Sequence, residues 1–249
     1  LSFSSGNAGA EASDAETWLE ALSCLAAISS VTSRAKLIAS VIILPQRNLL
    51  ELIKVATTID FLSGGRFVLG VGSGWNQREM NALGYDFATR GQRMDEMLDV
   101  MRGMRDDSVQ AYAGQQLSVP PGIRMSPSPT GRRSIPLYIG GSGVSKVSIR
   151  RTLAYGDGWM PYSMAGEYDA DALRRTMDYL RTERARAGLK PFDTIFKLGV
   201  TGHASRLLDV TVQELASIGF DEIIVQGIWD AGIERGIATI RRLQDLLDA

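Results

Sequence analysis

Two glycine-rich stretches carry the residues of this chain that are best suited to bind a ligand. The first runs through Gly72, Ser73 and Gly74, and the second comprises Gly140, Gly141 and Ser142. Each follows a short, apolar, β-prone segment and precedes a helical pattern. Glycine lets main-chain N–H groups approach a ligand closely, and a helix N-terminus favours an anion. The pattern predicts a site for phosphate or a flat cofactor, while two tight strand-to-helix turns are the alternative.

Two tryptophans are expected at strand ends. Trp75 directly follows the first glycine-rich stretch, and Trp159 lies in the short segment 158–161. An indole in such a place can form a wall of a substrate or ring pocket. The alternative is a half-buried residue that seals the mouth of the fold, and the sequence leaves both interpretations open.

Metal and thiol chemistry find little support in the composition. His203 is the only histidine, and no CxxC or HExxH spacing occurs, so no metal site is predicted. Cys24 is the only cysteine, which excludes an internal disulfide framework. It lies in an apolar helical run, where a buried and inert thiol is the favoured interpretation.

The length and net charge of the chain limit the number of domains and the kinds of partner to be expected. The chain has 249 residues, of which 45% are hydrophobic and 22% charged, with a net charge of −1. This is enough for one large α/β domain or two small ones. A nearly neutral chain offers no electrostatic reason to expect nucleic acid or an anionic membrane as partner. With no apolar run of about 18 residues and no signal-peptide pattern, a cytoplasmic location is predicted.

Strand and helix patterns alternate along most of the chain. Strands are expected at 37–44, 66–71, 136–139, 158–161, 195–200 and 222–226, with a further candidate at 1–4. Helices are expected at 14–28, 49–62, 90–105, 144–155, 169–187, 205–218 and 232–247, and Asp169 and Ser205 are candidate N-caps. Residues 108–134, rich in Pro, Gly and Ser, interrupt the alternation as an insertion. Loops of this length are often lids or binding loops.

Repeated strand–helix units with short connections predict a parallel sheet. Such a sheet is either open and doubly wound or closed as an eight-stranded barrel. A barrel requires another strand–helix unit near residues 10–13, where the sequence has no room for one. The unit is either deleted or disordered and missing from the chain as given, and the second explanation is favoured.

A set of short motifs in a fixed order resembles one family. The motifs are PQRN (45–48), LSGGR (62–66), GVGSGW (70–75), ALG (82–84), RGQRMDE (90–96), PLYIGGSG (136–143) and GDGWMP (156–161). Together they resemble the luciferase-like monooxygenase superfamily, and most closely its actinobacterial branch that uses the deazaflavin coenzyme F420. The resemblance covers about residues 21–161 well and the C-terminal units loosely.

The resemblance implies a fold and a cofactor position. The fold is a single (β/α)8 TIM barrel over residues 1–249, with the insertion at 108–134, and the cofactor lies at the C-terminal ends of the strands. A non-prolyl cis peptide, here Ser40–Val41, backs the central ring of the cofactor. The stretch Gly72–Gly74 also binds the cofactor, and Gly140, Gly141 and Ser142 contact its phosphate. The family further implies a homodimer.

The charged residues at 78–79 and 90–96 and the insertion 108–134 are not assigned to catalysis or to the cofactor. Arg90, Arg93, Asp95 and Glu96 are interpreted as charges on a helix face or as a dimer contact rather than as catalytic groups. Arg78 and Glu79 could pair with each other or reach the site, and a solvated helix start is the alternative. The insertion 108–134 is the candidate for a substrate-facing lid.

At two positions this sequence differs from the family, and both differences concern catalytic residues. Sugar-phosphate dehydrogenases of the family have an acidic residue where this chain has Trp75, and an indole cannot donate or accept the proton as a carboxylate does. The family often has a histidine after its second strand, and His203, in another loop, does not match it. No catalytic acid or base is therefore assigned.

Three functions remain open at this stage. The first is hydride transfer between coenzyme F420 and an unknown small organic substrate. The second is an FMN-dependent monooxygenase on the same fold. The third is a non-catalytic homologue that binds no cofactor. In the first two, the cofactor supplies the reaction and the protein supplies binding and orientation.

Overall fold

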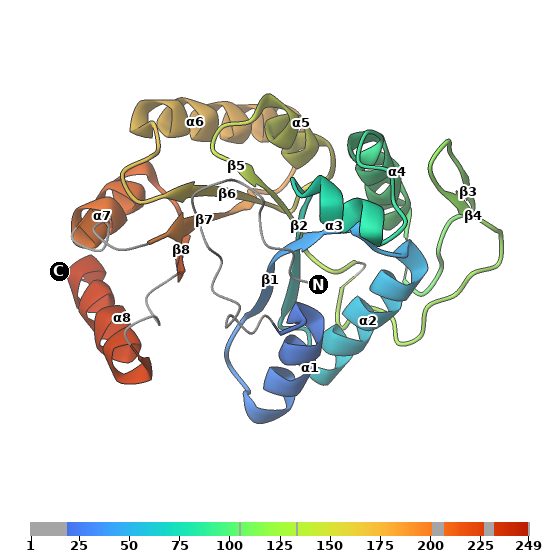
Figure 1. The fold of residues 1–249 in the computed structure, drawn as a ribbon, viewed down its shortest axis with the longest axis horizontal. Coiled ribbons are helices and arrows are strands. Elements are labelled where there is room, and N and C mark those ends of the chain that lie inside the picture. Colours follow the sequence, from blue (N-terminus) through green and yellow to red (C-terminus); the bar gives the residue numbers. More distant parts are fainter. Residues whose placement is uncertain (1–18, 105, 133, 201–206, 227–231, 249) are drawn as a thin grey trace. The chain divides into compact units, whose positions relative to one another are not determined.

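The computed structural model describes residues 19–104, 106–132, 134–200, 207–226 and 232–248 (Figure 1). The chain divides into two compact units, Leu1–Pro136 and Leu137–Ala249. The expected strand at 1–4, the residues near 10–13, His203 and the N-cap Ser205 lie outside the described residues. A single domain over 1–249 stays a prediction.

The first unit is built around two parallel strands. Its helices and strands are α1 (Ala21–Val31), β1 (Leu37–Ile43), η1 (Leu44–Gln46), α2 (Leu49–Leu62), β2 (Phe67–Gly72), α3 (Gln77–Ala82), α4 (Arg90–Gly103), β3 (Tyr112–Ala113) and β4 (Ser118–Val119). Strands β1 and β2 pair in parallel, and β3 and β4 form a separate antiparallel hairpin. Strand β2 is buried along its whole length, as expected for a parallel strand covered on both faces.

The LSGGR motif explains how α2 is connected to β2. The Ser63 hydroxyl donates to the carbonyl of Asp60 at the end of α2, and Gly65 takes a φ of +85° that glycine adopts without strain. The guanidinium of Arg66 then donates to the carbonyls of Ser29 and Thr32 at the end of α1. Arg66 thus satisfies helix-end carbonyls and fixes where β2 begins.

The second unit repeats the strand–helix pattern four times. Its elements are β5 (Leu137–Ser142), α5 (Lys146–Tyr155), β6 (Gly158–Met164), α6 (Ala170–Arg186), β7 (Asp193–Gly199), α7 (Leu208–Ile218), β8 (Glu222–Gln226) and α8 (Ile233–Asp248). The strands lie parallel in the order β5-β6-β7-β8. Asp169 caps α6 as expected, because its carboxylate accepts from the N–H of Ala172 at 2.8 Å.

The two faces of this second sheet differ. Trp159, Phe196 and Leu198 belong to one buried apolar cluster with residues of α6 and α7, so their face is covered by helices. Successive strand residues point to opposite faces. Tyr162 and Lys197, which are paired in the register of β6 and β7, therefore lie on the face opposite these helices.

Several boundaries differ from those expected. The expected second glycine-rich loop is wrong in one respect: Gly140, Gly141 and Ser142 are the last residues of β5 rather than residues after it. Strand β6 continues past Pro161 to Met164, because Pro161 keeps its place in the parallel register opposite Gly141. The turn η1 and the hairpin within the insertion had no counterpart in the pattern, and α3 corresponds to the helix start considered at Arg78 and Glu79.

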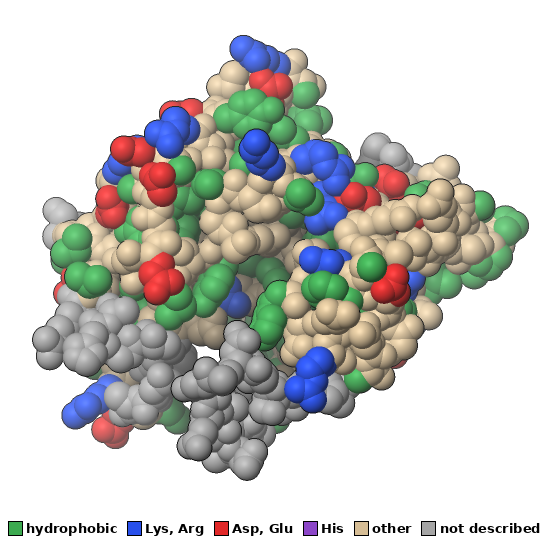
Figure 2. Space-filling view, turned by 45° about the horizontal axis from the view of Figure 1, so that its top comes forward, with side chains coloured by type: hydrophobic (Ala, Val, Ile, Leu, Met, Phe, Trp, Pro, Cys, Tyr) green, Lys and Arg blue, Asp and Glu red, His purple; other side chains and the backbone are tan. Residues whose placement is uncertain are grey.

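The surface and the helices give two further observations. On the face drawn in Figure 2, acidic and basic side chains are interspersed among apolar and other groups. Among the described residues, no helix combines the length and apolarity needed to cross a bilayer. The same ranges contain no grouping of three His, Cys, Asp or Glu residues that could hold a metal ion.

Candidate functional site

In the first unit, the glycine-rich stretch packs directly against β1. A Cβ on Gly72 would lie 3.0 Å from Cγ2 of Val41, and a Cβ on Gly74 would lie 2.6 Å from Cγ2 of Ile43. Gly74 also has a φ of +78°. The positive φ and the close approach at Gly74 require glycine, and Gly72 leaves little room for a side chain, so close packing explains this loop whether or not it binds a ligand. The Ser40–Val41 peptide is cis, which confirms that prediction.

Arg90 holds this glycine loop in place. Its Nε donates to the carbonyl of Gly74 at 3.3 Å, and its guanidinium lies 3.7 Å from the centre of the Phe87 ring. A cation over an aromatic face is held electrostatically. The interpretation of Arg90 as a helix-face charge is therefore corrected, because its contacts lie within the unit, and a dimer contact stays a prediction.

Arg93 and Glu96 clamp the insertion. The Arg93 guanidinium donates to the carbonyls of Pro45 and Arg47 in the turn after β1, and to that of Gln116 in the hairpin. The Glu96 carboxylate accepts from the N–H groups of Gln115 and Gln116 at 3.0 and 2.9 Å. Both side chains thus tie the β3–β4 hairpin to its own unit, which corrects their interpretation as charges on a helix face, and a dimer contact stays a prediction. A substrate-facing lid stays a prediction.

Replacing Glu96 with alanine should release this hairpin. Glu96 is 7% exposed, and its loss leaves the two hairpin N–H groups without their acceptor. We expect cleavage within residues 110–120 by a broad-specificity protease to accelerate about tenfold, which corresponds to about 1.4 kcal/mol for local opening. Limited proteolysis followed by mass spectrometry measures this rate. Asp171→Ala, at an exposed carboxylate of α6, is the control, and an unchanged rate in Glu96→Ala would contradict the clamp.

The two tryptophans occupy different environments. Trp75 follows β2 and is 75% exposed, and the next residue, Asn76, caps α3 by accepting from the N–H of Glu79. Its position at a strand end agrees with the sequence, and its role in a pocket stays a prediction. Glu79 lies in the first turn of α3, which favours the helix-start interpretation.

Trp159 does not line a pocket. It is the second residue of β6, far from the carboxyl end where barrel enzymes place their sites, and it is 0% exposed. Its ring packs 5.7 Å from that of Phe220 in the apolar cluster below α6 and α7. The prediction of a pocket wall at Trp159 is therefore corrected to a core position.

In the second unit, the end of β5 is fitted to the start of α5. A Cβ on Gly141 would lie 2.8 Å from Cβ and 2.9 Å from Oγ of Ser148. The N–H of Gly143 donates to the carbonyl of Tyr162 at 2.9 Å, which fixes the loop beside β6. The strand end, the loop and the helix start are thus held at close distance.

The start of α5 has the groups that an anion requires. Ser145, the N-cap, makes no side-chain capping bond, and Lys146 follows it in the first turn. Ser148 is 5% exposed, and its Oγ has no hydrogen-bond partner among the described residues. An unpaired buried hydroxyl costs about 1–3 kcal/mol, so a bound acceptor would stabilise it. Sequence reasoning missed Lys146 and Ser148, although both follow the G-G-S-G stretch closely.

The amino end of the same sheet carries a different polar group. The Tyr138 hydroxyl donates to the carboxylate of Asp193 on the face opposite the helices. Burial, and then this hydrogen bond, raise the pKa of Tyr138 above its ordinary value. The phenol stays neutral, and we infer that it stabilises the packing of β5 with β7 rather than moving a proton.

Comparison with known proteins places the chain in a family. The model of the family described as luciferase-like monooxygenase matches residues 6–206, which is most of the chain. The chain belongs to the luciferase-like monooxygenase family. This family consists of oxidoreductases, and the parallel strand–helix units described above are those of its barrel fold.

Curated relatives are found among mycobacteria. An uncharacterized protein of Mycobacterium tuberculosis is 32% identical over 181 residues, which cover 72% of this chain and 59% of the relative. Another M. tuberculosis protein, named as a proposed coenzyme F420-dependent oxidoreductase, is 33% identical over 170 residues, covering 62% and 48%. The chain thus matches less than two thirds of the length of these luciferase-like relatives.

Solved structures agree on the fold. A monooxygenase from Streptomyces bottropensis has a TM-score of 0.75 and 19% identity, covering 92% of this chain and 82% of its own. The oxygenating constituent of 3,6-diketocamphane monooxygenase from Pseudomonas putida, in complex with FMN, has a TM-score of 0.60 and 17% identity. It covers 91% of this chain and 62% of its own. At such identities the likeness concerns the luciferase-like barrel fold alone.

Proposed function

We propose that this protein is an oxidoreductase that transfers a hydride between coenzyme F420 and a small organic substrate. The observation that carries the proposal is the anion site at the start of α5, where the buried Ser148 hydroxyl lacks a partner and Lys146 adds a positive charge. Coenzyme F420 contains a phosphate group that such a site fits. The sequence relative named for F420 supports the choice of cofactor.

The residues of β5 and α5 would hold that phosphate. Gly141 allows the strand end to approach the helix. The first N–H groups of an α-helix have no acceptor within the helix, so those of α5 would be donors to the phosphate. Ser148 would add a hydroxyl donor. Assignment of the ring system to Ser40 and Val41, and of further cofactor contacts to Gly72–Gly74, stays a prediction, as do the homodimer and the cytoplasmic location.

The cofactor would carry the hydride, and the protein would supply binding and orientation. Bound coenzyme F420 supplies a carbon centre that donates or accepts a hydride. The chain's own contribution is to fix the phosphate, orient the substrate and exclude water. None of the described residues is assigned as the acid or base, because Trp75 replaces the carboxylate that some relatives use.

FMN is the second candidate cofactor. It also carries a phosphate, and both monooxygenase structures reported above share this fold, one of them in complex with FMN. With FMN in its reduced form as the two-electron donor, the reaction would consume oxygen, insert one atom into the substrate and release the other as water. The proposed anion site suits the phosphate of either cofactor. Measured affinities for F420 and FMN therefore have to distinguish the two.

A titration of the purified protein with F420 and, separately, with FMN tests the proposal. Cofactor fluorescence reports binding. Tight binding of F420 alone supports hydride transfer, and tight binding of FMN alone would replace it by a monooxygenase. Binding of neither would contradict both and leave the non-catalytic homologue.

Ser148→Ala tests the anion site directly. Loss of one hydroxyl bond to a charged group amounts to about 1.5 kcal/mol, so we expect the dissociation constant of F420 to rise about tenfold. The same titration measures it. Ser217→Ala, which removes an exposed hydroxyl bonded to the carbonyl of Glu214 in α7, should leave the constant unchanged. Equal constants for both variants would exclude Ser148 from the phosphate site.

A further inference from the structure

A lysine and a tyrosine lie together on the sheet face opposite the helices of the second unit. Tyr162 of β6 and Lys197 of β7 are register partners, and each is two residues from the carboxyl end of its strand. In a (β/α)8 barrel the helices cover the outside, and ligands bind at the carboxyl ends of the strands. The helix-free face of this sheet corresponds to the inner face of such a barrel, and the pair lies on it close to the carboxyl ends of β6 and β7.

The lysine is held at a defined place. Its Nζ lies 5.5 Å from the centre of the Tyr162 ring, within the range of a cation–π contact. Desolvation by burial lowers the pKa of Lys197 below its ordinary value. An ammonium group kept out of bulk water interacts more strongly with an anion than one at the surface.

Gly199 makes room for the tyrosine. A Cβ at this position would lie 2.8 Å from the Tyr162 hydroxyl and would overlap the sulfur of Met164. The hydroxyl donates to that thioether sulfur at 3.0 Å, and a thioether is a weak acceptor. Tyr162 is also 37% exposed. A ligand oxygen would therefore offer the hydroxyl a better partner than the sulfur does.

The surroundings favour a small anion that enters from the carboxyl end. Met160 and Ile195, toward the amino end of the same face, are buried and apolar. Among the described residues of β5 to β8, the acidic groups on this face are Asp193 and Glu222, which also lie toward the amino end, since Glu222 pairs with Ile195. The negative charges are thus on the side away from the strand ends, and the positive charge is nearer to them.

We propose that Lys197 and Tyr162 form a subsite for a carboxylate group of the substrate. This inference rests on the proposed function, because it names the class of substrate that the carboxyl ends of these strands would receive. One cationic donor and one neutral donor match the two oxygens of a planar carboxylate. A dianionic phosphate would require more donors than this pair provides.

Binding of small probes to the purified protein tests the subsite without any cofactor. The probes are benzoate, the neutral isostere benzamide, and phenyl phosphate, with dissociation constants from ligand-observed NMR. We expect benzoate to bind at least tenfold more tightly than benzamide. Equal binding of benzoate and benzamide, or absence of benzoate binding, would overturn the proposal. Tighter binding of phenyl phosphate than of benzoate would overturn the choice of carboxylate.

Two variants test whether the preference for benzoate depends on Lys197 and Tyr162. Lys197→Met should weaken benzoate binding at least tenfold and leave benzamide binding unchanged, and Tyr162→Phe should weaken benzoate about threefold. Lys190→Met, at an exposed lysine before β7, is the matched control. Thermal melting checks that each variant folds. If Lys197→Met and Lys190→Met have the same dissociation constant for benzoate, Lys197 does not form the proposed subsite.

The F420 titration of the same variants separates this inference from the proposed function. Lys197→Met should bind F420 as the unmodified protein does. A protein that binds F420 but shows no preference for benzoate retains the proposed function and loses the subsite. A protein that prefers benzoate through Lys197 but binds no F420 retains the carboxylate site and loses the proposed reaction.

Discussion

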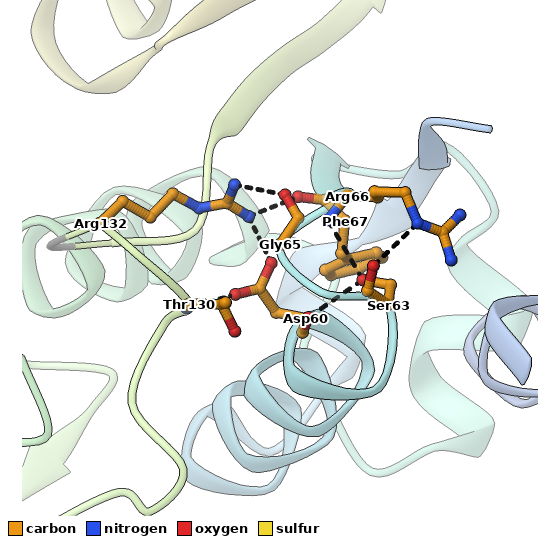
Figure 3. A network of polar contacts seen from close by, with 7 residues as sticks. All are labelled: Asp60, Ser63, Gly65, Arg66, Phe67, Thr130 and Arg132. Carbon is orange, nitrogen blue, oxygen red and sulfur yellow. Dashed lines mark hydrogen bonds and ion pairs between the residues drawn. The ribbon is translucent and has the colours of Figure 1, made fainter. Parts of the chain in front are cut away.

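Replacing Asp60 with alanine should lower the free energy of unfolding by about 3–5 kcal/mol, the range found when one member of a buried ion pair is removed. Asp60 is 0% exposed in α2 and pairs with the guanidinium of Arg132 (Figure 3). Its other oxygen accepts from the N–H of Thr130 at 2.8 Å. The substitution leaves a cation and a backbone N–H without their buried acceptor.

The hydrogen bonds of Asp60 and Arg132 also attach the end of the insertion to the start of β2. Arg132 also donates to the carbonyls of Gly65 and Phe67, which flank the start of β2 (Figure 3). The end of the segment 108–134 is thereby anchored where α2 passes into β2. Loss of Asp60 should therefore destabilise this junction first and make the end of the insertion accessible to exchange.

Urea unfolding, followed by intrinsic fluorescence, measures the change. Asp171→Ala is the matched control, because its carboxylate forms an exposed pair with Arg174 in α6 and should contribute less than about 1 kcal/mol. In the double variant Asp60→Leu with Arg132→Met, both charges are absent, and most of the lost stability should return. A loss below about 1 kcal/mol in Asp60→Ala would show that the pair is dispensable.

The periodicity of the sequence was sufficient for most of the elements. Helix α2 and strand β8 have the predicted bounds, because Asn48 caps the start of α2 and β8 is a short run dominated by apolar residues. Trp159 was misplaced for a physical reason. A strand buried on both faces has no polar alternation, so its sequence does not say which face an apolar residue takes.

The candidate site was only partly predictable. The glycine-rich stretches stand out because close packing and turns demand glycine. Arg93 was misread because its acceptors are carbonyls at residues 45, 47 and 116, and such distant backbone partners leave no local pattern. Ser148 was missed because a lone serine in a helix is ordinary until its neighbours are known to leave the hydroxyl unpaired.

Replacing Gly141 with alanine should weaken F420 binding by about 10- to 100-fold, even though only one methyl group is added. The new Cβ would lie 2.8 Å from Cβ of Ser148, and neither atom is the end of a flexible chain. Overpacking of this kind costs about 1–3 kcal/mol. The strain is relieved by moving the start of α5 away from β5, which displaces the N–H groups and the hydroxyl proposed to bind the phosphate.

A double-variant cycle distinguishes this clash from a general loss of stability. In Ser148→Gly, the opposing Cβ and Oγ are absent, so adding Gly141→Ala to that background should change the F420 dissociation constant less than threefold. Both single variants should bind F420 more weakly than the unmodified protein. If Gly141→Ala costs the same affinity in both backgrounds, its effect does not pass through Ser148. The junction of β5 and α5 would then not be the part of the fold that sets cofactor affinity.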